Sequence, residues 1–473
     1  MGRDDPRRRL YPYQVEGVRL LDEKGRLILA DEMGLGKTAQ ALSADFCLPL
    51  LVICPLSLLP TWSREARKWA PDITKVVEVV GTQKKRAKLW ASREPGEKAI
   101  YIVSYESAKA DEKMIRIWRG GVVIDEAHKL RNRTKTQLFL SLRRMTRLAG
   151  TMYLLTGTPV VNHPSEVWSY LHLLDRGRYR SFWRWVAQFF VLEEAGWGLD
   201  VGAFLSDTAR EEYERQIHEF LLRRTKDEVG IQLPRRTEAM IPVRLTQQEW
   251  ADYCSMYRSY MVTSESGRNT IAGTTLEQLT YLRLLAYGKG FLDGQDAPRT
   301  GSSKIRAAMD ALSGCGGPAV TFSAFSRVAE AAAVDFRLDE WDTATLTGDT
   351  PLPQRRKLLE WFDEPAARGR RKLLCMTAEV GGLGLSLTSA NVAVMLDKLW
   401  ADALNRQSED RIHRIGQLRP VTIYSTVAEG TVDEYIQQVI DEKLALIGSV
   451  NWAAKEVLRR AVDRMSSVPQ KNE

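Results

Sequence analysis

A glycine-containing loop near the start of the chain has the residue types that bind phosphate. The stretch RLILADEMGLGKTAQALS reads as an apolar run, then the loop, then a helical pattern. Gly34 and Gly36 let the backbone turn its N–H groups inward, and the helix that follows adds partial positive charge. Lys37 supplies a full charge for the β- and γ-phosphates of a nucleotide, and Thr38 a hydroxyl for Mg²⁺. The alternative is a turn that carries an incidental lysine.

A pair of carboxylates follows another apolar run, in GGVVIDEAHKL, where Asp125 and Glu126 end the run. Open α/β sheets bind ligands at the carboxyl ends of their strands. Asp125 suits coordination of Mg²⁺, and Glu126 could orient or deprotonate an attacking water. With the phosphate loop upstream, the pair predicts a site that hydrolyses a nucleoside triphosphate. The alternative is a polar loop after a buried strand.

Two arginines near the other end of the chain could complete this site. Arg411 and Arg414 lie in QSEDRIHRIGQ, residues 407–417, and residues three apart on a helix share a face. An arginine offered to a transferring γ-phosphoryl group stabilises the developing charge, which is worth about 10³–10⁵ in rate. The alternative is two arginines on a solvated helix.

The elements that must position these residues follow a repeating pattern. Short apolar runs alternate with helical patterns up to about residue 175 and again after about residue 300. This alternation predicts an α/β fold with two parallel sheets, and the long helical patterns between them predict helical insertions. The short extended piece RRTEAMIPVRL is interpreted as part of the linker. The expected domains are a first lobe over 1–235 with an insertion at about 176–235, a second lobe over 236–450 with an insertion at about 245–300, and a tail over 451–473.

Composition narrows the class of protein. A chain of 473 residues is too long for one hydrophobic core, and a net charge of +8 suits a polyanionic partner. Five dispersed cysteines without a C-x-x-C pair favour a reducing compartment. The charged start is unlike a secretory signal, and no apolar run approaches the roughly 18 residues of a membrane span. We therefore expect a cytoplasmic or nucleoid-associated protein with no membrane partner.

Taken together, the motifs resemble those of the Swi/Snf-type ATPases of helicase superfamily two. The resemblance begins with LYPYQVEGVRLL and continues with ILADEMGLGKT, in which Asp31 stands where the strict phosphate loop has glycine. It then covers VICPLSLLPTWSREARKW, VIDEAHKLRN, LLTGTPVVN, FLLRRTKDEVGIQLPRRTEAMIPVRLT, TLTGDTPLPQRRKLLEWF, TAEVGGLGLSLTSAN and QSEDRIHRIGQ. The matching motifs run from about residue 10 to about residue 445.

The resemblance implies two RecA-like lobes that bind ATP and Mg²⁺ and move along double-stranded DNA, usually without separating its strands, with unidentified protein partners supplying targeting. Nucleotide-binding positions would be Gln14, Gly34, Gly36, Lys37, Thr38 and Gln407. Metal would be held by Thr38 and Asp125, and the catalytic residues would be Glu126, Arg411 and Arg414. Hydrolysis would be coupled to DNA by Thr156, Thr158, Gly382 and Gly384.

Two departures and two alternative functions accompany this resemblance. Glu379 stands where many members have a basic residue, and Ala401 and Asp402 stand where the family often has Asn-Pro. These departures count against nucleosome remodelling and leave the ATPase expectation in place. A strand-separating DEAH-type DNA or RNA helicase is disfavoured by the ending HRIGQ. A nucleotide-gated DNA-binding scaffold without turnover is disfavoured because the residues expected to hydrolyse ATP are all present.

Overall fold

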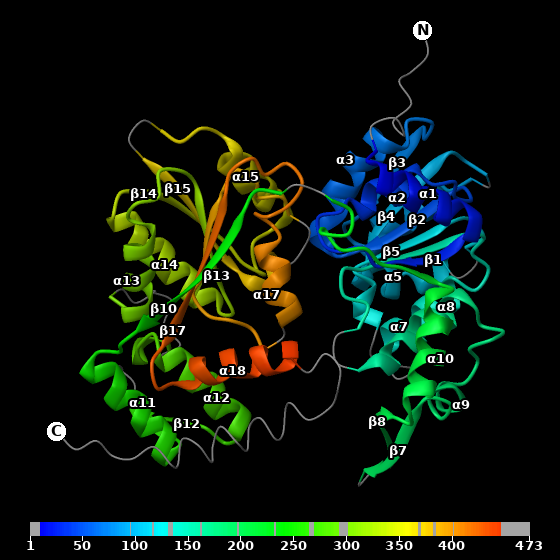
Figure 1. Cartoon of the computed structure of the whole chain (residues 1–473). Helices are drawn as coiled ribbons and strands as arrows, with labels where there is room; N and C mark the ends of the chain where they lie inside the picture. The colour runs from blue at the N-terminus through cyan, green and yellow to red at the C-terminus, as the bar shows by residue number, and fades with distance from the viewer. Residues whose placement is uncertain are drawn as a thin grey trace. The chain divides into compact units, whose positions relative to one another are not determined.

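The chain forms two compact units, shown in Figure 1 from blue to green for the first and from green to red for the second. The structure is a computed structural model. It describes residues 10–94, 96–115, 118–130, 136–160, 163–195, 198–230, 233–263, 269–292, 301–367, 370–381, 385–400 and 402–445. The described part of the first unit ends at Gly230, and the second unit begins at Leu233.

The first unit is built on a sheet whose seven described strands all run parallel. Strands covered on both faces read as continuous apolar runs, which is why LLVIC and AIYIVS were recognisable in the sequence. The strand order is β3 (Lys75–Val79), β4 (Ala99–Ser104), β2 (Leu50–Cys54), β5 (Val122–Asp125), β6 (Met152–Leu155), β1 (Arg26–Leu29) and β9 (Leu221–Leu222).

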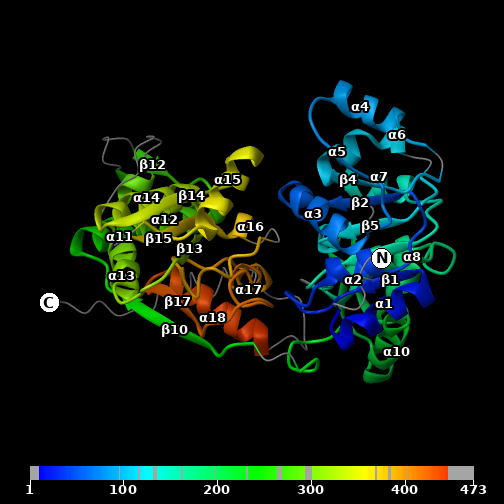
Figure 2. The ribbon, with the colours of Figure 1, turned by 90° about the horizontal axis from the view of Figure 1, so that it is seen from above.

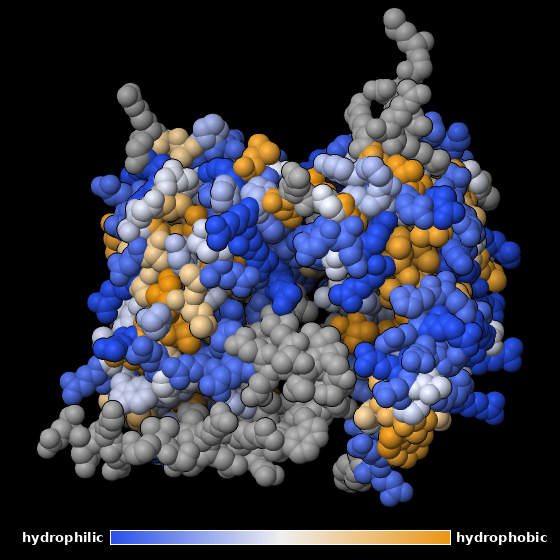
Figure 3. All heavy atoms as spheres, in the orientation of Figure 1, coloured by the Kyte–Doolittle hydropathy of each residue, from blue (hydrophilic) through white to orange (hydrophobic). Residues whose placement is uncertain are grey.

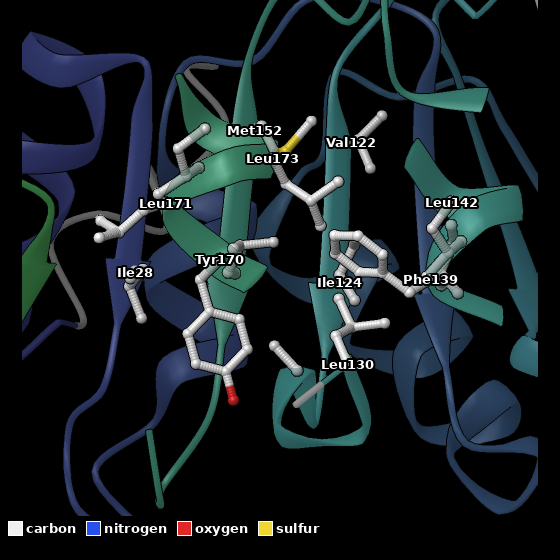
Figure 4. Close-up of a cluster of buried hydrophobic side chains, with 14 of the residues drawn as sticks. Ile28, Val122, Ile124, Leu130, Phe139, Leu142, Met152, Tyr170, Leu171 and Leu173 are labelled. Atoms are coloured by element: carbon white, nitrogen blue, oxygen red, sulfur yellow. The ribbon is translucent and has the colours of Figure 1, made fainter. Parts of the chain in front are cut away.

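Helices cover both faces of this sheet, because successive side chains of a strand point to opposite faces. Ile28 belongs to one buried cluster, and its neighbours Leu27 and Leu29 belong to the other. Figure 4 shows Ile28 of the sheet in the first cluster, together with Phe139 from a covering helix. The helices are α1 (Pro12–Lys24), α2 (Lys37–Ser43), α3 (Leu59–Trp69), α4 (Gln83–Ala91), α5 (Tyr105–Ala110), α6 (Glu112–Ile115), α7 (Gln137–Met145) and α8 (Trp168–Leu174).

The insertion expected to be helical contains a β-hairpin, so that prediction was wrong in part. Between α9 (Phe182–Val186) and α10 (Asp207–His218), β7 (Phe190–Ala195) pairs antiparallel with β8 (Gly198–Phe204). Phe190 and Phe204 face each other across the hairpin, with ring centres 4.6 Å apart, and both pack against a buried cluster that also includes residues of the first sheet. Figure 3 shows apolar side chains gathered over this part of the surface, at the lower right, and the exposed ones include Trp183, Val191 and Leu205.

The second unit has its own parallel sheet, with the strands in the order β10-β17-β16-β13-β15-β14. RRTEAMIPVRL is not a linker, because residues 236–243 form the edge strand β10, which pairs along its whole length with β17. Figure 2 shows β10 along the edge of this sheet. The bounds are β10 (Arg236–Val243), β13 (Ala319–Ser323), β14 (Trp341–Leu346), β15 (Arg371–Thr377), β16 (Val392–Met395) and β17 (Val421–Ala428).

Helices again cover both faces of the second sheet, and they contribute to two separate buried clusters. A third cluster joins α11, α12 and α18. The region expected as a second helical insertion also contains a small hairpin of β11 (Met261–Thr263) and β12 (Asn269–Ile271). The helices are α11 (Gln247–Ser259), α12 (Thr275–Leu285), α13 (Ser303–Leu312), α14 (Ser326–Leu338), α15 (Leu352–Asp363), α16 (Ala378–Gly381), α17 (Asp402–Glu409) and α18 (Val432–Ala445).

The prediction of an α/β fold with two parallel-sheet lobes is confirmed. Among the helices that the structure describes, none has both the length and the apolar composition that crossing a membrane requires.

Candidate nucleotide site

Three loops of the first unit meet at one edge of its sheet. They follow β1, β6 and β5, which are neighbouring parallel strands, so their carboxyl ends lie together. The backbone N–H of Thr156, after β6, donates to the carbonyl of Leu29 at 3.2 Å. A Cβ added to Gly157 would lie 2.6 Å from Cγ of Met33 in the loop after β1. The loops after β1 and β6 are therefore in direct contact.

The loop after β1 has the backbone shape that its glycines allow. Gly34 has a φ of 86° and Gly36 a φ of 74°, both in the left-handed region, and Gly36 is the residue from which α2 begins. The ammonium of Lys37, in the first turn of α2, donates to the carbonyl of Asp31 at 2.6 Å and to that of Glu32 at 3.2 Å. The charge of Lys37 is thus held against the loop that would surround a phosphate.

The first turn of α1 contacts this loop. Nε2 of Gln14 and the hydroxyl of Tyr13 both donate to the carbonyl of Leu35, at 3.1 and 3.0 Å. A Cβ at Gly36 would lie 2.4 Å from Nε2 of Gln14, so this position admits only glycine without a shift. The sequence placed Gln14 at the nucleotide by resemblance, and the structure places its side chain on the loop.

Asp125 is buried at the end of β5 and accepts two hydrogen bonds. Nε1 of Trp62 donates to its Oδ2 at 2.8 Å, and the backbone N–H of Glu126 donates to its Oδ1 at 2.9 Å. Burial raises the pKa of Asp125 to about 6, and the charge of Glu126 acts in the same direction. The bond from Trp62 and the charge of Lys37 lower the pKa of this carboxyl. Lys37 and Asp125 therefore interact electrostatically within one site.

Glu126 has an unusual backbone conformation, with a φ of 53°. The hydroxyl of Tyr105 donates to the carbonyls of both Asp125 and Glu126, at 2.6 and 3.2 Å, and so fixes this turn. Oε2 of Glu126 lies 3.2 Å from Nδ1 of His128. A residue held in a strained conformation next to a buried carboxylate is a common feature of active sites.

The oxygen donors at this edge fit Mg²⁺. Carboxylate and hydroxyl oxygens are ligands that this hard ion accepts, and Asp125 and Thr38 supply one of each. In the described part of the chain no cluster of three His, Cys, Asp or Glu residues could hold a metal by itself. Mg²⁺ usually keeps several waters and is bound through one or two carboxylates together with the phosphates of a substrate.

The arginines of the second unit are not on a helix, so the prediction of a shared helix face was wrong. The helix α17 ends at Glu409. The N–H of Asp410 still bonds four residues back, to Arg406, but the N–H groups of Arg411 and Ile412 bond three residues back, at 3.2 and 3.1 Å. Arg411 and Arg414 lie in the turns that follow. Gln407 remains on α17 and is buried.

Arg411 is 5% exposed, which rules out the solvated-helix alternative for this residue. Its Nε donates to the carbonyl of Gln407 at 3.0 Å, and its own carbonyl accepts from the backbone N–H of Leu387. Arg414 is half-buried, and its guanidinium donates to the carbonyl of Leu385 at 3.3 Å. Both arginines thus lie beside the segment after α16. Gly382 and Gly384, in the same motif, lie outside the described residues.

Comparison with known proteins identifies the chain. The profile of the SNF2-related domain matches residues 13–286, which is more than half of the sequence. The chain belongs to the SNF2-related family. A second profile, that of the helicase conserved C-terminal domain, matches residues 303–416. The resemblance seen in the sequence is thereby confirmed.

Several relatives of this SNF2-related chain have descriptive names. A probable ATP-dependent DNA helicase of Arabidopsis thaliana, CHR23, is 29% identical over 93% of this chain and 43% of its own length. The chromatin structure-remodeling complex subunit snf21 of Schizosaccharomyces pombe is 29% identical over 94% of this chain and 40% of its own length. The solved Sulfolobus solfataricus SWI2/SNF2 ATPase core in complex with dsDNA is 26% identical, covers 92% of both chains and has a TM-score of 0.43. The chain spans less than half the length of these two curated relatives.

Sequence reasoning missed three residues around the site of this SNF2-related chain. Trp62, Tyr105 and Arg224 contact the loops through side chains that come from other elements. Trp62 lies inside VICPLSLLPTWSREARKW and Arg224 inside FLLRRTKDEV, so both were in quoted motifs, yet neither spacing nor residue type showed what they contact. Tyr105 had no signal in the sequence.

Proposed function

We propose that this chain is an ATP-dependent motor that moves along double-stranded DNA. The observation that carries the proposal is that the loop leading to Lys37 and the buried pair Asp125 and Glu126 follow β1 and β5, on either side of β6, in a chain of the SNF2-related family. A phosphate-binding ammonium, a metal-binding carboxylate and a second carboxylate for water are the groups that hydrolysis of ATP requires.

Each residue of the first unit has a role in this proposal. The backbone around Gly34 and Gly36 and the ammonium of Lys37 hold the β- and γ-phosphates. Thr38 and Asp125 hold Mg²⁺, which when bound neutralises charge on the phosphates. Glu126 orients the attacking water or accepts its proton. Gln14 contacts the adenine end of the same ATP.

Residues of the second unit are proposed to act on the same ATP. Gln407 would contact the nucleotide, and Arg411 and Arg414 would stabilise the charge that develops on the γ-phosphoryl group. Thr156, Thr158, Gly382 and Gly384 would couple hydrolysis to DNA. The name of the solved Sulfolobus relative records a complex with dsDNA, and a net charge of +8 suits the same partner here.

The motor would act on genomic DNA in the cytoplasm or at the nucleoid. The two curated relatives named above are more than twice as long as the part they share with this chain. Further protein partners would supply targeting. The strand-separating alternative is less well supported, since the matching profile over the first unit is that of the SNF2-related domain.

The test compares Mg²⁺-dependent ATP hydrolysis with duplex DNA, single-stranded DNA and RNA of matched length. We expect the largest stimulation with duplex DNA, and we expect it to fall as salt rises because phosphate contacts release counterions. A strand-displacement assay in parallel should show no unwinding. A preference for RNA or efficient unwinding would support the helicase alternative, and no hydrolysis with any nucleic acid would support the scaffold.

A further inference from the structure

The chain leaves the first unit along its phosphate loop. Residues 220–224 extend the pairing of β9 with β1, because backbone N–H groups of Ile28, Ala30 and Glu32 donate to carbonyls of Phe220, Leu222 and Arg224, at 2.7, 2.7 and 2.8 Å. The last of these three bonds lies within the loop itself. The segment FLLRRTKDEV therefore contacts the loop through its backbone before the second unit begins at Leu233.

Arg224 adds a side-chain contact to this pairing. Its Nε donates to Oδ1 of Asp31 at 2.9 Å, and its terminal nitrogen donates to Oδ2 of Asp31 at 2.6 Å and to Oε1 of Gln40 at 2.9 Å. The guanidinium also donates to the carbonyl of Tyr13 and lies 5.2 Å from the centre of that ring. One side chain thus joins the loop to α1 and α2.

Asp31 depends on this arginine. Its side chain is fully buried, and a buried carboxylate without its partner is costly. Gln40 donates to the same carboxylate at 3.0 Å, and the main-chain carbonyl of Asp31 accepts from Lys37. Asp31 stands where the strict phosphate loop has glycine, and its carboxylate is the acceptor that Arg224 binds. Because the main-chain carbonyl of Asp31 also accepts from Lys37, one residue of the loop connects Arg224 to Lys37.

The fit around the network is close. A Cβ added to Gly17 on α1 would lie 1.9 Å from Oε1 of Gln40 and 2.9 Å from the terminal nitrogen of Arg224. Next along the chain, the backbone N–H of Lys226 donates to Oε2 of Glu32 at 2.7 Å, and its ammonium lies 3.4 Å from Oε1 of the same carboxylate. Two successive loop carboxylates are thus held by the outgoing segment.

We propose that Arg224 is a positioning residue of the nucleotide site, which holds the phosphate loop in its binding shape through Asp31. This inference rests on the proposed ATPase function and names a residue that the sequence motifs leave without a role. Because Arg224 acts on the free protein, its loss lowers the fraction of molecules whose loop is ready to bind. The apparent affinity for nucleotide falls in proportion to the fraction of molecules that remain competent.

The test measures binding of Mg-ATP and steady-state hydrolysis in the full chain with Arg224→Gln, Arg224→Lys and Asp31→Asn. A matched control is Arg86→Gln. Arg86 makes a bidentate ion pair with Asp111 in the same unit, at 2.8 and 2.9 Å, and the side chains are 12% and 0% exposed against 14% and 0% for Arg224 and Asp31. Arg224→Gln and Arg86→Gln should both lower the unfolding temperature, but of these two variants only Arg224→Gln should change nucleotide affinity.

We expect Arg224→Gln to raise the Kd and KM for Mg-ATP at least about tenfold, which corresponds to a loop in its binding shape in about one molecule in ten. The kcat at saturating ATP should change much less. Arg224→Lys, which keeps the charge without the bidentate geometry, should fall between Arg224→Gln and wild type. When Asp31→Asn is already present, Arg224→Gln should add little, since the two residues act as one unit.

Unchanged affinity in folded Arg224→Gln, or an equal loss in Arg86→Gln, would overturn the inference. If Arg224→Gln does not fold, Arg224→Lys and Asp31→Asn decide in the same way. Failure of the proposed function is distinguishable, because wild-type protein would then neither bind nor hydrolyse Mg-ATP.

Discussion

The indole N–H of Trp62 donates a hydrogen bond of 2.8 Å to Oδ2 of Asp125, and both side chains are buried. Trp62 lies on α3 and Asp125 at the end of β5, so a helix on one face of the sheet fixes a carboxylate at its edge. We therefore predict that Trp62→Phe lowers kcat for ATP hydrolysis, because the carboxylate loses one of its two orienting donors. A hydrogen bond to a charged group is worth about 1.5–3 kcal/mol, so the loss should be roughly ten- to hundredfold if orientation is its role.

The control for this prediction is Trp118→Phe. Trp118 is equally buried in the same unit and donates to a backbone carbonyl, that of Gly121, at 2.9 Å. Steady-state hydrolysis and thermal unfolding are measured for both variants. Equal kcat in the two, at similar loss of stability, would mean that Trp62 only supports the fold.

Lys37→Ala should abolish ATP hydrolysis and leave the fold intact. The ammonium donates to two loop carbonyls that water can satisfy in its place, so the free energy of unfolding should change by no more than about 0.5 kcal/mol. Hydrolysis assays and circular dichroism check this, with the exposed Lys84→Ala on α4 as the control. Wild-type hydrolysis by a folded Lys37→Ala protein would show that the loop does not bind phosphate.

Glu126→Gln should bind ATP normally and hydrolyse it slowly. The substitution keeps the size of the side chain but removes the base, and general-base catalysis contributes about 10²–10⁴ in rate. Nucleotide titration beside single-turnover hydrolysis separates the two effects. If turnover stays within about twofold of wild type, as is usual for substitutions away from a site, another group handles the water.

Arg414→Ala should reduce turnover by about 10³-fold while ATP affinity stays near wild type, because an arginine on the γ-phosphoryl group acts in the transition state. Arg419→Ala is the control, since Arg419 is an exposed arginine five residues after Arg414. Arg411→Ala should behave like Arg414→Ala but also lose stability, because this side chain is buried. Near-normal single-turnover rates with duplex DNA in both variants would show that neither arginine acts on the γ-phosphoryl group.

The sequence predicted the parts of the fold that have a local pattern. Strands buried on both faces, such as β2 and β4, are apolar throughout, and the loop with Gly34 and Gly36 has a fixed motif. The sequence marked residues 236–243 as extended but missed their place as the edge strand β10, because their burial alternates irregularly, they include Pro242, and their partner β17 lies far along the chain. Periodicity is a local signal and carries no information about such a partner.

The site shows the same division. Lys37, Asp125 and Glu126 could be found because their chemistry requires those residue types at the ends of strands. The end of α17 at Glu409 depends on backbone hydrogen bonds that no residue type in QSEDRIHRIGQ marks, since it contains no proline and its glycine comes seven residues later. The pairing of Arg224 with Asp31 joins residues far apart in sequence, and only tertiary structure could reveal it.

The pairing of β10 with β17 also affects how the protein is made. Arg236 pairs with Val421, so the first strand of the second unit emerges from the ribosome 185 residues before its partner. At synthesis rates of about 5–20 residues per second, β10 waits on the order of 10–40 s with no strand beside it. All seven described strands of the first sheet, the last of them β9, have been synthesised by then, so the first unit can fold before the second is complete. The charges of Arg236 and Glu238 on the waiting strand oppose its pairing with other nascent chains, which is how natural sheet edges avoid aggregation.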